Sequence, residues 1–319
     1  MVTVLITEGM HEEGIGLLQR AGFSTVTPGD TFQVNDVQII VVRSVFQINN
    51  ETLTQYPSVK IVAKLGTGID NIDQALCASK GIEVLSVPGM NAISTAEFAV
   101  TQILNIFKNS FEIYTRVQNR DFRRNLYYGK EISGYTAGVI GFGKVGKAIA
   151  DRLRPFVKEL YIRDRHTEGD VIADGFHFVA DQNTLLDRCD IVILAVPLKS
   201  NKKMVNQVFL ENIKENCVLI NIARGGLIDE QALVAFLKSH PDARYYCDVT
   251  DPEPNYFLPP EEQPYQSSLF NLPNVLYTPH IANLTDECQR RIALLPLIPM
   301  MKYWVAGLLS RNWYRKERK

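Results

Sequence analysis

With 319 residues, 46% of them hydrophobic and 22% charged, the chain is too long for one ordinary hydrophobic core and suits two domains of roughly 100 to 200 residues each. Its formal charge of −1 leaves no basic excess for phosphates, so we expect no nucleic acid partner. No apolar run reaches the roughly 18 residues of a membrane span, and the amino terminus lacks a signal peptide pattern, which predicts a cytoplasmic protein without a membrane partner.

Taken in chain order, short runs rich in valine, isoleucine and leucine alternate with stretches of helical periodicity. The first series of runs lies at 2–7, 37–43, 59–66 and 82–88. A second series lies at 136–143, 158–164, 190–197, 217–223, 243–249 and 274–280. Such alternation is typical of parallel sheets covered by helices on both faces. The two series therefore predict an α/β fold with two doubly wound sheets.

The segment 94–117 between the two series is long and amphipathic, and it could carry the chain from one domain to the other. Helical periodicity returns in the last part of the chain, from 285 to the basic tail. If that helix returns to the first domain, the second domain is an insertion. The expected domains are then 1–104 plus 288–319, and 105–287.

The five cysteines are odd in number, widely spaced and mostly embedded in apolar runs. Thiols in such places are more often reduced and buried than bound to a metal or redox active. We therefore expect buried thiols, and no metal site, at Cys77, Cys189, Cys217, Cys247 and Cys288.

Three glycines in GVIGFGKVG have the spacing GxGxxG directly after a strand-like run; they are Gly141, Gly143 and Gly146. Glycines there suit a tight strand-to-helix turn, and they also let the backbone and the helix N-terminal amides approach a pyrophosphate. Asp164 ends the next run, where an acid accepts hydrogen bonds from an adenosine ribose and repels a 2′-phosphate. Together these residues predict a dinucleotide site that favours NAD over NADP, although two arginines flank Asp164 and weaken that preference.

Three charged side chains follow successive runs in the second half of the chain. Arg224 follows the run 217–223, and a guanidinium there can bind a carboxylate through two parallel hydrogen bonds. Glu253 comes after the next run, in the proline-rich stretch 251–273, which predicts an irregular loop. His280 ends the last run, at the same edge of a parallel sheet, where ligands of α/β proteins bind.

Each of these residues also has a plainer interpretation, as a surface arginine, a solvated carboxylate or a structural histidine. Their convergence on one sheet edge favours chemistry instead. A carboxylate fixes the tautomer of an imidazole and stabilises its protonated form, which suits proton exchange with a substrate hydroxyl. Arginine, glutamate and histidine form the set that a hydride-transfer enzyme needs beside a nicotinamide.

A glycine-rich turn also follows a run of the first series, in KLGTGIDNID. Its exposed amides, around Thr67 and Gly68, can form a small anion-binding nest. A turn without a ligand fits the same residues.

The chain resembles the D-isomer-specific 2-hydroxyacid dehydrogenases over nearly its whole length. The motifs that carry the resemblance are KLGTGIDNID, VPGMNAISTAEFAV, GVIGFGKVGKAIA with Asp164, INIARGGLIDEQAL, DVTDPEP and TPHIANLTDE. The resemblance implies two Rossmann-like domains, with an NAD domain inserted into a split substrate domain, and usually a homodimer. It implies a small 2-hydroxy or 2-keto acid as substrate and NAD as cofactor.

Carried over by motif, the resemblance implies a catalytic set in which Arg224 binds the substrate, Glu253 holds the histidine, and His280 exchanges the proton. The backbone around Thr67 and Gly68 would hold the substrate carboxylate. The implied cofactor contacts are Gly141, Gly143, Lys144, Val145, Gly146, Asp164, Pro197, Ile222, Ala223, Arg224, Asp248, His280 and Ala282.

Within the family, VVRSVFQIN is most similar to the phosphoglycerate dehydrogenases, where an arginine and a serine at this strand end meet the substrate phosphate. Arg43 and Ser44 occupy that place, and an exposed polar strand end would look the same. No regulatory domain is expected after the last helix. Ala282 and Asn283 stand where the family often has glycines, and Asn283 could change the nicotinamide pocket.

Two other functions fit the same motifs. Formate dehydrogenases share the fold but pair their histidine with a glutamine, so Glu253 speaks against them. A non-enzymatic, NADH-responsive binding protein would keep the catalytic residues, and only turnover can exclude it.

Overall fold

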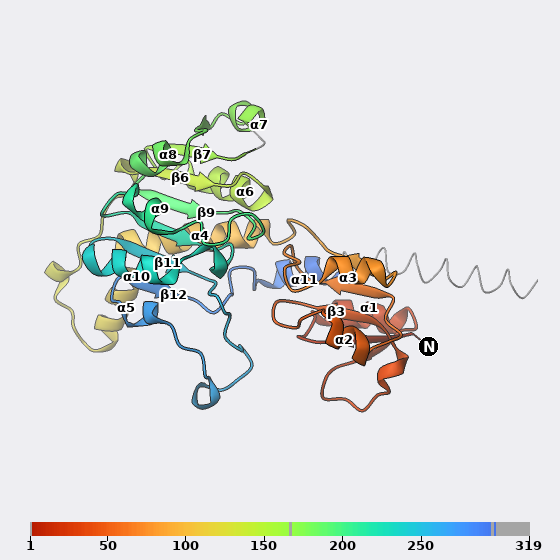
Figure 1. Cartoon of the computed structure of the whole chain (residues 1–319). Helices are drawn as coiled ribbons and strands as arrows, with labels where there is room; N and C mark the ends of the chain where they lie inside the picture. The colour runs from red at the N-terminus through yellow and green to blue at the C-terminus, as the bar shows by residue number, and fades with distance from the viewer. Residues whose placement is uncertain (1, 166–167, 295–296, 298–319) are drawn as a thin grey trace, which may run out of the picture. The chain divides into compact units, whose positions relative to one another are not determined.

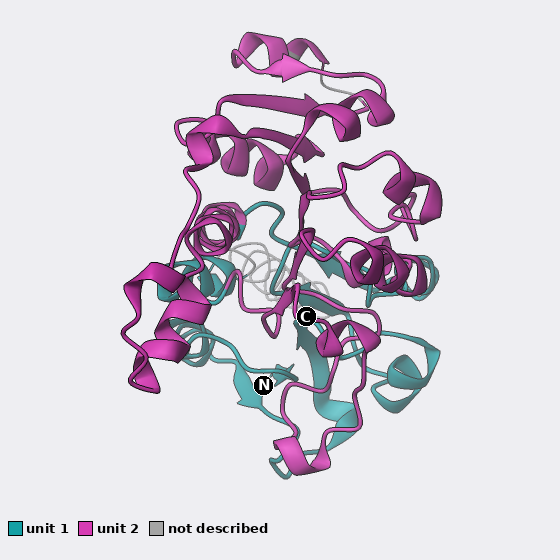
Figure 2. Cartoon of the chain, turned by 90° about the vertical axis from the view of Figure 1, so that its left-hand side faces the viewer, with its two compact units in different colours: residues 1–91, 284–319 teal, residues 92–283 magenta. Residues whose placement is uncertain are grey.

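The computed structural model of the chain describes residues 2–165, 168–294 and 297 (Figure 1). Unit 1 combines the chain up to Asn91 with the described residues from Leu284 on, and unit 2 runs from Ala92 to Asn283 (Figure 2). Each unit is built on one parallel sheet with helices on both faces. The expected α/β fold with two doubly wound sheets is confirmed.

The unit 1 sheet has the strand order β2-β1-β3-β4-β5, with every pair parallel. Its strands are β1 Thr3–Ile6, β2 Ser24–Val26, β3 Val37–Val42, β4 Ile61–Lys64 and β5 Glu83–Leu85. Its helices are α1 Glu12–Arg20, η1 Val34–Asp36, α2 Asn50–Gln55, α3 Gln74–Ser79 and α11 Asp286–Leu294. Successive strand residues alternate between two cores, as the period of a strand requires. Ile39 and Val41 pack with α1 and α11, whereas Ile40 and Val42 pack with α2 and α3.

The unit 2 sheet has the strand order β12-β11-β10-β9-β6-β7-β8, again with every pair parallel (Figure 1). Its strands are β6 Thr136–Ile140, β7 Glu159–Arg163, β8 His177–Phe178, β9 Ile191–Leu194, β10 Val218–Asn221, β11 Arg244–Cys247 and β12 Val275–Tyr277. The order reverses between β6 and β9, which is the switch point where dinucleotides bind in Rossmann folds.

The helices of unit 2 cover its sheet from both sides. They are α4 Ala92–Lys108, α5 Ser110–Gln118, α6 Lys144–Leu153, α7 Glu168–Ala173, α8 Gln182–Arg188, α9 Gln207–Glu211 and α10 Glu230–Ser239. Short 3-10 helices are η2 Arg124–Leu126, η3 Ile132–Gly134, η4 Gly225–Leu227, η5 Pro260–Glu262 and η6 Ser268–Asn271. One core joins α4 and α6 to the sheet, and the other joins α8, α9 and α10 to its opposite face.

Several details differ from the expectations. β2 and β8 were not expected, because they are three and two residues long, half exposed, and give no apolar run. The amphipathic segment 94–117 is two helices, because Asn109 adopts a left-handed conformation, with φ 52°, between α4 and α5. All five cysteines are buried, as expected. Helical periodicity was also expected after α11, up to the basic tail, but that part of the chain lies outside the described residues.

The unit boundaries fall at 91/92 and 283/284, not at the expected 104/105 and 287/288. α4 lies wholly in unit 2 because Ala96, Ala99 and Ile103 on it are part of that unit's core. α11 contacts unit 1 from its first residue, since Asp286 is hydrogen-bonded to His11. None of the described helices is long and apolar enough to cross a membrane.

Gly225 lies at a close approach between two loops of unit 2. A Cβ at Gly225 would lie 1.9 Å from the carbonyl carbon of Thr250 and 2.5 Å from the nitrogen of Asp251. We expect Gly225→Ala to lower the free energy of unfolding by about 1–3 kcal/mol, as overpacking does, with a lower midpoint in thermal unfolding. Gly134→Ala is the control, because a Cβ there meets no atom within 4 Å. Equal midpoints for the two variants would contradict the close approach.

Candidate active site

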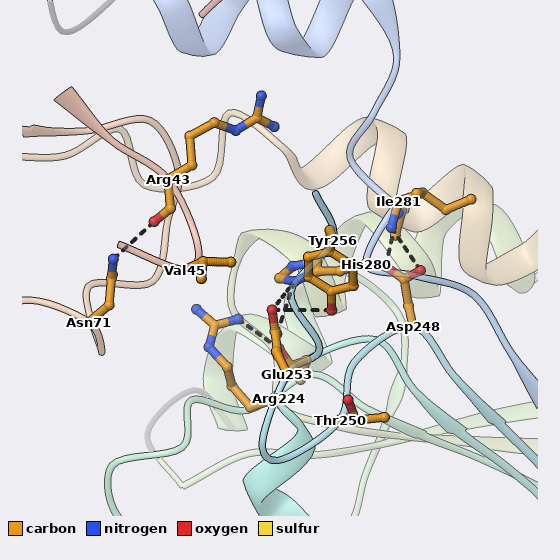
Figure 3. A network of polar contacts seen from close by, with 12 residues as sticks. Arg43, Val45, Asn71, Arg224, Asp248, Thr250, Glu253, Tyr256, His280 and Ile281 are labelled. Atoms are coloured by element: carbon orange, nitrogen blue, oxygen red, sulfur yellow. Dashed lines mark hydrogen bonds and ion pairs between the residues drawn. The ribbon is translucent and has the colours of Figure 1, made fainter. Parts of the chain in front are cut away.

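The candidate catalytic residues of unit 2 come from neighbouring strand ends. β10, β11 and β12 are adjacent and parallel, so their carboxyl ends meet at one edge of the sheet. Arg224 follows β10, Glu253 follows β11, and His280 follows β12. Figure 3 shows the three side chains as sticks. The sequence placed these residues at one edge, and the structure brings Glu253 and His280 into direct contact.

Glu253 and His280 form a hydrogen-bonded pair. Nδ1 of His280 lies 2.9 Å from Oε1 and 3.0 Å from Oε2 of Glu253. The side chains are 21% and 24% exposed, so the pair is largely shielded from water but still open to a ligand. An ionised carboxylate only accepts hydrogen bonds, so Nδ1 carries the proton and Nε2 is left to exchange one with a ligand.

His280 lies in a tight turn that Asp248 holds. The backbone of His280 has φ 54°, which is uncommon for a residue other than glycine. The Asp248 carboxylate accepts hydrogen bonds from Thr278 Oγ1 at 2.5 Å and from the N–H groups of Ile281 and Ala282, both at 2.9 Å. These contacts fix the chain on both sides of His280.

Asp248 is almost fully buried, with 1% of its surface exposed. Burial raises the pKa of the Asp248 carboxyl, while the hydrogen bonds from Thr278, Ala282 and Ile281 and the charge of His280 oppose that rise. Tyr246 extends the network, because its hydroxyl is hydrogen-bonded to Thr278. Asp248 and Ala282, which are also expected at the cofactor, thus take part in the contacts that hold the turn.

Arg224 is held in an extended conformation at the start of η4. Asn221 is fully buried, and its amide nitrogen donates to the Arg224 carbonyl at 2.9 Å. Its side-chain oxygen accepts from the Ala223 N–H at 3.1 Å. Asn221 was not expected to support the site, although a polar residue within the apolar run 217–223 indicates a buried hydrogen-bonding role.

The glycine motif makes a turn that fits a dinucleotide. Gly141 has φ 104°, and a Cβ on it would lie 2.5 Å from the Ala195 carbonyl oxygen. A Cβ on Gly146 would lie 1.9 Å from the Gly141 carbonyl oxygen, so β6 and α6 meet too closely for a side chain. Gly143, by contrast, faces open space at the N-terminus of α6. That arrangement leaves room for a pyrophosphate at the helix amides.

Asp164 stands at the end of β7, beside the glycine turn. Its Oδ2 accepts a hydrogen bond from the Phe142 N–H at 2.8 Å, so it also supports the turn itself. A pocket of about 510 Å³ lies at Asp164, of a size typical for ligand sites. It is lined by Arg163, Asp164, Arg165, Glu168, Gly169, Phe178 and Ala180.

The other expected cofactor contacts lie at the same edge of the unit 2 sheet. Lys144 and Val145 form the first turn of α6, at the switch point between β6 and β9. Pro197 follows β9, and Ile222 and Ala223 follow β10. Their positions at strand ends and at a helix N-terminus fit a cofactor that extends along this edge.

In unit 1, the expected substrate residues come from two adjacent strand ends. Arg43 and Ser44 follow β3, and Thr67 and Gly68 follow β4, its neighbour in the sheet. Thr67 Oγ1 donates to Asn91 Oδ1 at 2.7 Å and accepts from the Gly89 N–H at 3.1 Å. In the described part of the chain, the Thr67 and Gly68 N–H groups have no hydrogen-bond partner. These two amides are therefore available to an anion.

A buried polar network, which the sequence analysis missed, supports the loop at Arg43. Glu8 Oε2 and Oε1 accept from the N–H groups of Arg43 and Val45, both at 2.6 Å. Asn71 Nδ2 donates to the Arg43 carbonyl at 3.1 Å (Figure 3), and Lys64 Nζ contacts the same carbonyl. Burial lowers the pKa of the Arg43 guanidinium, while the charge of Glu8 opposes the change.

Comparison with known proteins agrees with this geometry. Residues 100–282 match the model of the family described as D-isomer specific 2-hydroxyacid dehydrogenase, NAD binding domain. The chain is 32% identical to the glyoxylate reductase of Thermococcus kodakarensis, over 92% of this chain and 90% of that protein. Its fold is similar to that of the D-lactate dehydrogenase of Aquifex aeolicus complexed with NAD and lactic acid, with a TM-score of 0.83, 26% identity and 96% of each chain covered.

The chain is also 30% identical to the D-3-phosphoglycerate dehydrogenase of Methanocaldococcus jannaschii, over 98% of this chain but 59% of that protein. It spans little more than half the length of the D-3-phosphoglycerate dehydrogenases that it matches. The expected family and its NAD cofactor are nevertheless confirmed by the domain match, which covers more than half of the chain. The chain belongs to the D-isomer specific 2-hydroxyacid dehydrogenases, a family of NAD-dependent oxidoreductases, and its unit 2 carries the NAD binding domain of that family.

Proposed function

We propose that the chain is an NAD-dependent dehydrogenase that interconverts a small D-2-hydroxy acid and its 2-keto acid. The observation that carries the proposal is the Glu253–His280 pair, 2.9 Å apart, at the strand end next to that of Arg224. A histidine fixed by a carboxylate and placed beside an arginine suits proton exchange with the oxygen on C2. In this proposal unit 2 binds NAD, and unit 1 is the substrate domain.

The roles of the residues follow from their chemistry. The nicotinamide of the bound cofactor supplies or accepts the hydride at C2. In the direction of reduction, His280 Nε2 donates a proton to the oxygen of the keto group, and Glu253 stabilises the imidazolium beforehand. Arg224 binds the substrate and stabilises the charge that develops on the same oxygen. The amides of Thr67 and Gly68 bind the substrate carboxylate, as their unpartnered N–H groups suggest.

On the cofactor side, the glycine turn and the N-terminus of α6 receive the pyrophosphate, and Asp164 receives the ribose. The open space at Gly143 and the pocket at Asp164 support this assignment. We assign the remaining contacts to Lys144, Val145, Pro197, Ile222, Ala223, Arg224, Asp248, His280 and Ala282, all of which follow strand ends or begin α6.

The substrate is proposed to carry a second anionic group, as 3-phosphoglycerate does. Arg43 is half-buried, and its guanidinium makes no hydrogen bond or ion pair in the part of the chain that the structure describes. A partly buried guanidinium without a counter-charge of its own favours an anion such as a phosphate. Ser44 follows it, exposed, and can add a hydroxyl to the same group.

Turnover of a substrate panel tests the proposal, with the absorbance of NADH as the readout. We expect activity on at least one member of a set of 2-keto acids plus 3-phosphoglycerate. His280→Ala should reduce that turnover on the order of 10²-fold or more, as loss of a general acid does, with NADH binding unchanged. His177→Ala, at an exposed position on β8, is the control.

Three outcomes would contradict the proposal. Near-normal turnover of His280→Ala would remove the histidine from the mechanism. Activity on formate alone would indicate a formate dehydrogenase. Activity on no acid, with NADH binding intact, would favour a binding protein that responds to NADH.

We also propose that the protein is a homodimer and that residues 110–128 form its interface. On α5, Phe111, Tyr114 and Val117 recur every three residues and therefore share one helix face. All three are exposed, and so are the large apolar side chains after the helix, which are Phe122, Leu126 and Tyr128. Figure 1 labels α5 at the lower left of unit 2. Several large apolar side chains exposed on one short segment are typical of an interaction site.

Sedimentation velocity tests this interface. We expect the wild type to sediment with twice the mass of one chain at micromolar concentration, and the double variant Tyr114→Glu, Phe122→Glu to sediment as a monomer, because charges there oppose burial. Phe257→Glu is the matched control, since Phe257 is equally exposed but lies in the loop 251–273. A monomeric wild type, or a dimeric double variant, would contradict the proposal.

A further inference from the structure

Tyr256 contacts both members of the catalytic pair. It lies three residues after Glu253, on the loop between β11 and β12. Its hydroxyl donates a hydrogen bond to Glu253 Oε2 at 3.3 Å (Figure 3). Its ring meets the imidazole of His280 edge-on, with ring centroids 6.3 Å apart and planes at 76°. No sequence motif singled out this residue.

The hydroxyl of Tyr256 shares an acceptor with the imidazole. Glu253 Oε2 accepts from His280 Nδ1 at 3.0 Å and from Tyr256 at 3.3 Å. A second donor on a carboxylate oxygen disperses its charge and lowers its basicity. The tyrosine hydroxyl and the imidazole therefore compete for one oxygen of the Glu253 carboxylate.

Tyr256 can act only as a donor toward the carboxylate. Burial raises the pKa of the Tyr256 hydroxyl, and the negative charge of Glu253 raises it further, so the proton stays on the tyrosine. The other titratable groups that face the pair are Asp248 from the end of β11, Tyr277 from β12 and Arg224 from the end of β10. Tyr256 and His280 are both hydrogen-bonded to Glu253.

We propose that Tyr256 is a positioning residue for the Glu253–His280 pair, whose hydroxyl sets how strongly Glu253 stabilises the imidazolium and whose ring orients the imidazole. The inference rests on the proposed function, because it concerns the proton that His280 exchanges with the substrate. Tyr256 itself need not touch the substrate. It tunes the pH range over which His280 acts as an acid.

Tyr256→Phe tests the inference, because it removes the hydroxyl and keeps the ring. We expect the titration midpoint of His280, followed by NMR of the imidazole C–H groups, to rise on the order of 0.5 pH unit, since hydrogen bonds to a carboxylate change its basicity on that scale. The His280 signal is identified by its absence in His280→Ala. The alkaline limb of the pH profile of kcat/KM for keto acid reduction, where His280 loses its proton, should move in the same direction.

Tyr265→Phe is the matched control. Tyr265 lies on the same loop, but its ring packs on Phe270. A midpoint in Tyr256→Phe that equals that of the control, or lies below it, overturns the inference whether or not the protein reduces keto acids. If the wild type turns over no substrate and the midpoint still rises in Tyr256→Phe alone, the proposed function fails and the role of Tyr256 stands.

Discussion

Parallel pairing of β10, β11 and β12 brings the carboxyl ends of the three strands to one edge of the unit 2 sheet. Because of this strand order alone, side chains that are many residues apart in the sequence lie at neighbouring strand ends. Arg224, Glu253 and His280 each need only be placed just after a strand. The same edge carries the glycine turn after β6 and Asp164 after β7, so the proposed cofactor site and the proposed catalytic pair share one sheet.

A strand end alone does not orient a side chain, and buried polar groups supply the rest. His280 has a backbone conformation that costs roughly 1–3 kcal/mol for such a residue, and it persists because Asp248 binds the chain on both sides of it. Asn221 does the same for the turn at Arg224, and Glu8 for the loop at Arg43. Each of these groups is hydrogen-bonded to backbone amides or carbonyls of the loop that it supports.

The sequence carried enough information for the sheets and for the residues at their edges. Apolar runs in the sequence predicted every long strand. The charged residues at the strand ends could be identified without knowing how the side chains pack. The break at Asn109 was not predictable from periodicity, because the apolar spacing continues through it. The short edge strands β2 and β8 bury too little to leave an apolar run.

Supporting residues were harder to predict than the residues they support. Tyr256 lies in an irregular, proline-rich loop, and its contact with Glu253 depends on how that loop folds. The sequence did not indicate that the Asp248 carboxylate accepts hydrogen bonds from three groups of the His280 turn. Contacts of this kind depend on tertiary structure, and no spacing rule in the sequence encodes them.

The most direct measurement of the central claim follows deuterium from NADH labelled on the nicotinamide carbon that gives up hydride. The protein would be given the labelled NADH and the 2-keto acid that it reduces fastest, and the product would be examined by NMR and chiral chromatography. The account predicts a 2-hydroxy acid of D configuration with the deuterium on C2. Label lost to water, or a product of L or mixed configuration, would contradict direct hydride transfer at a site built from Arg224, Glu253 and His280.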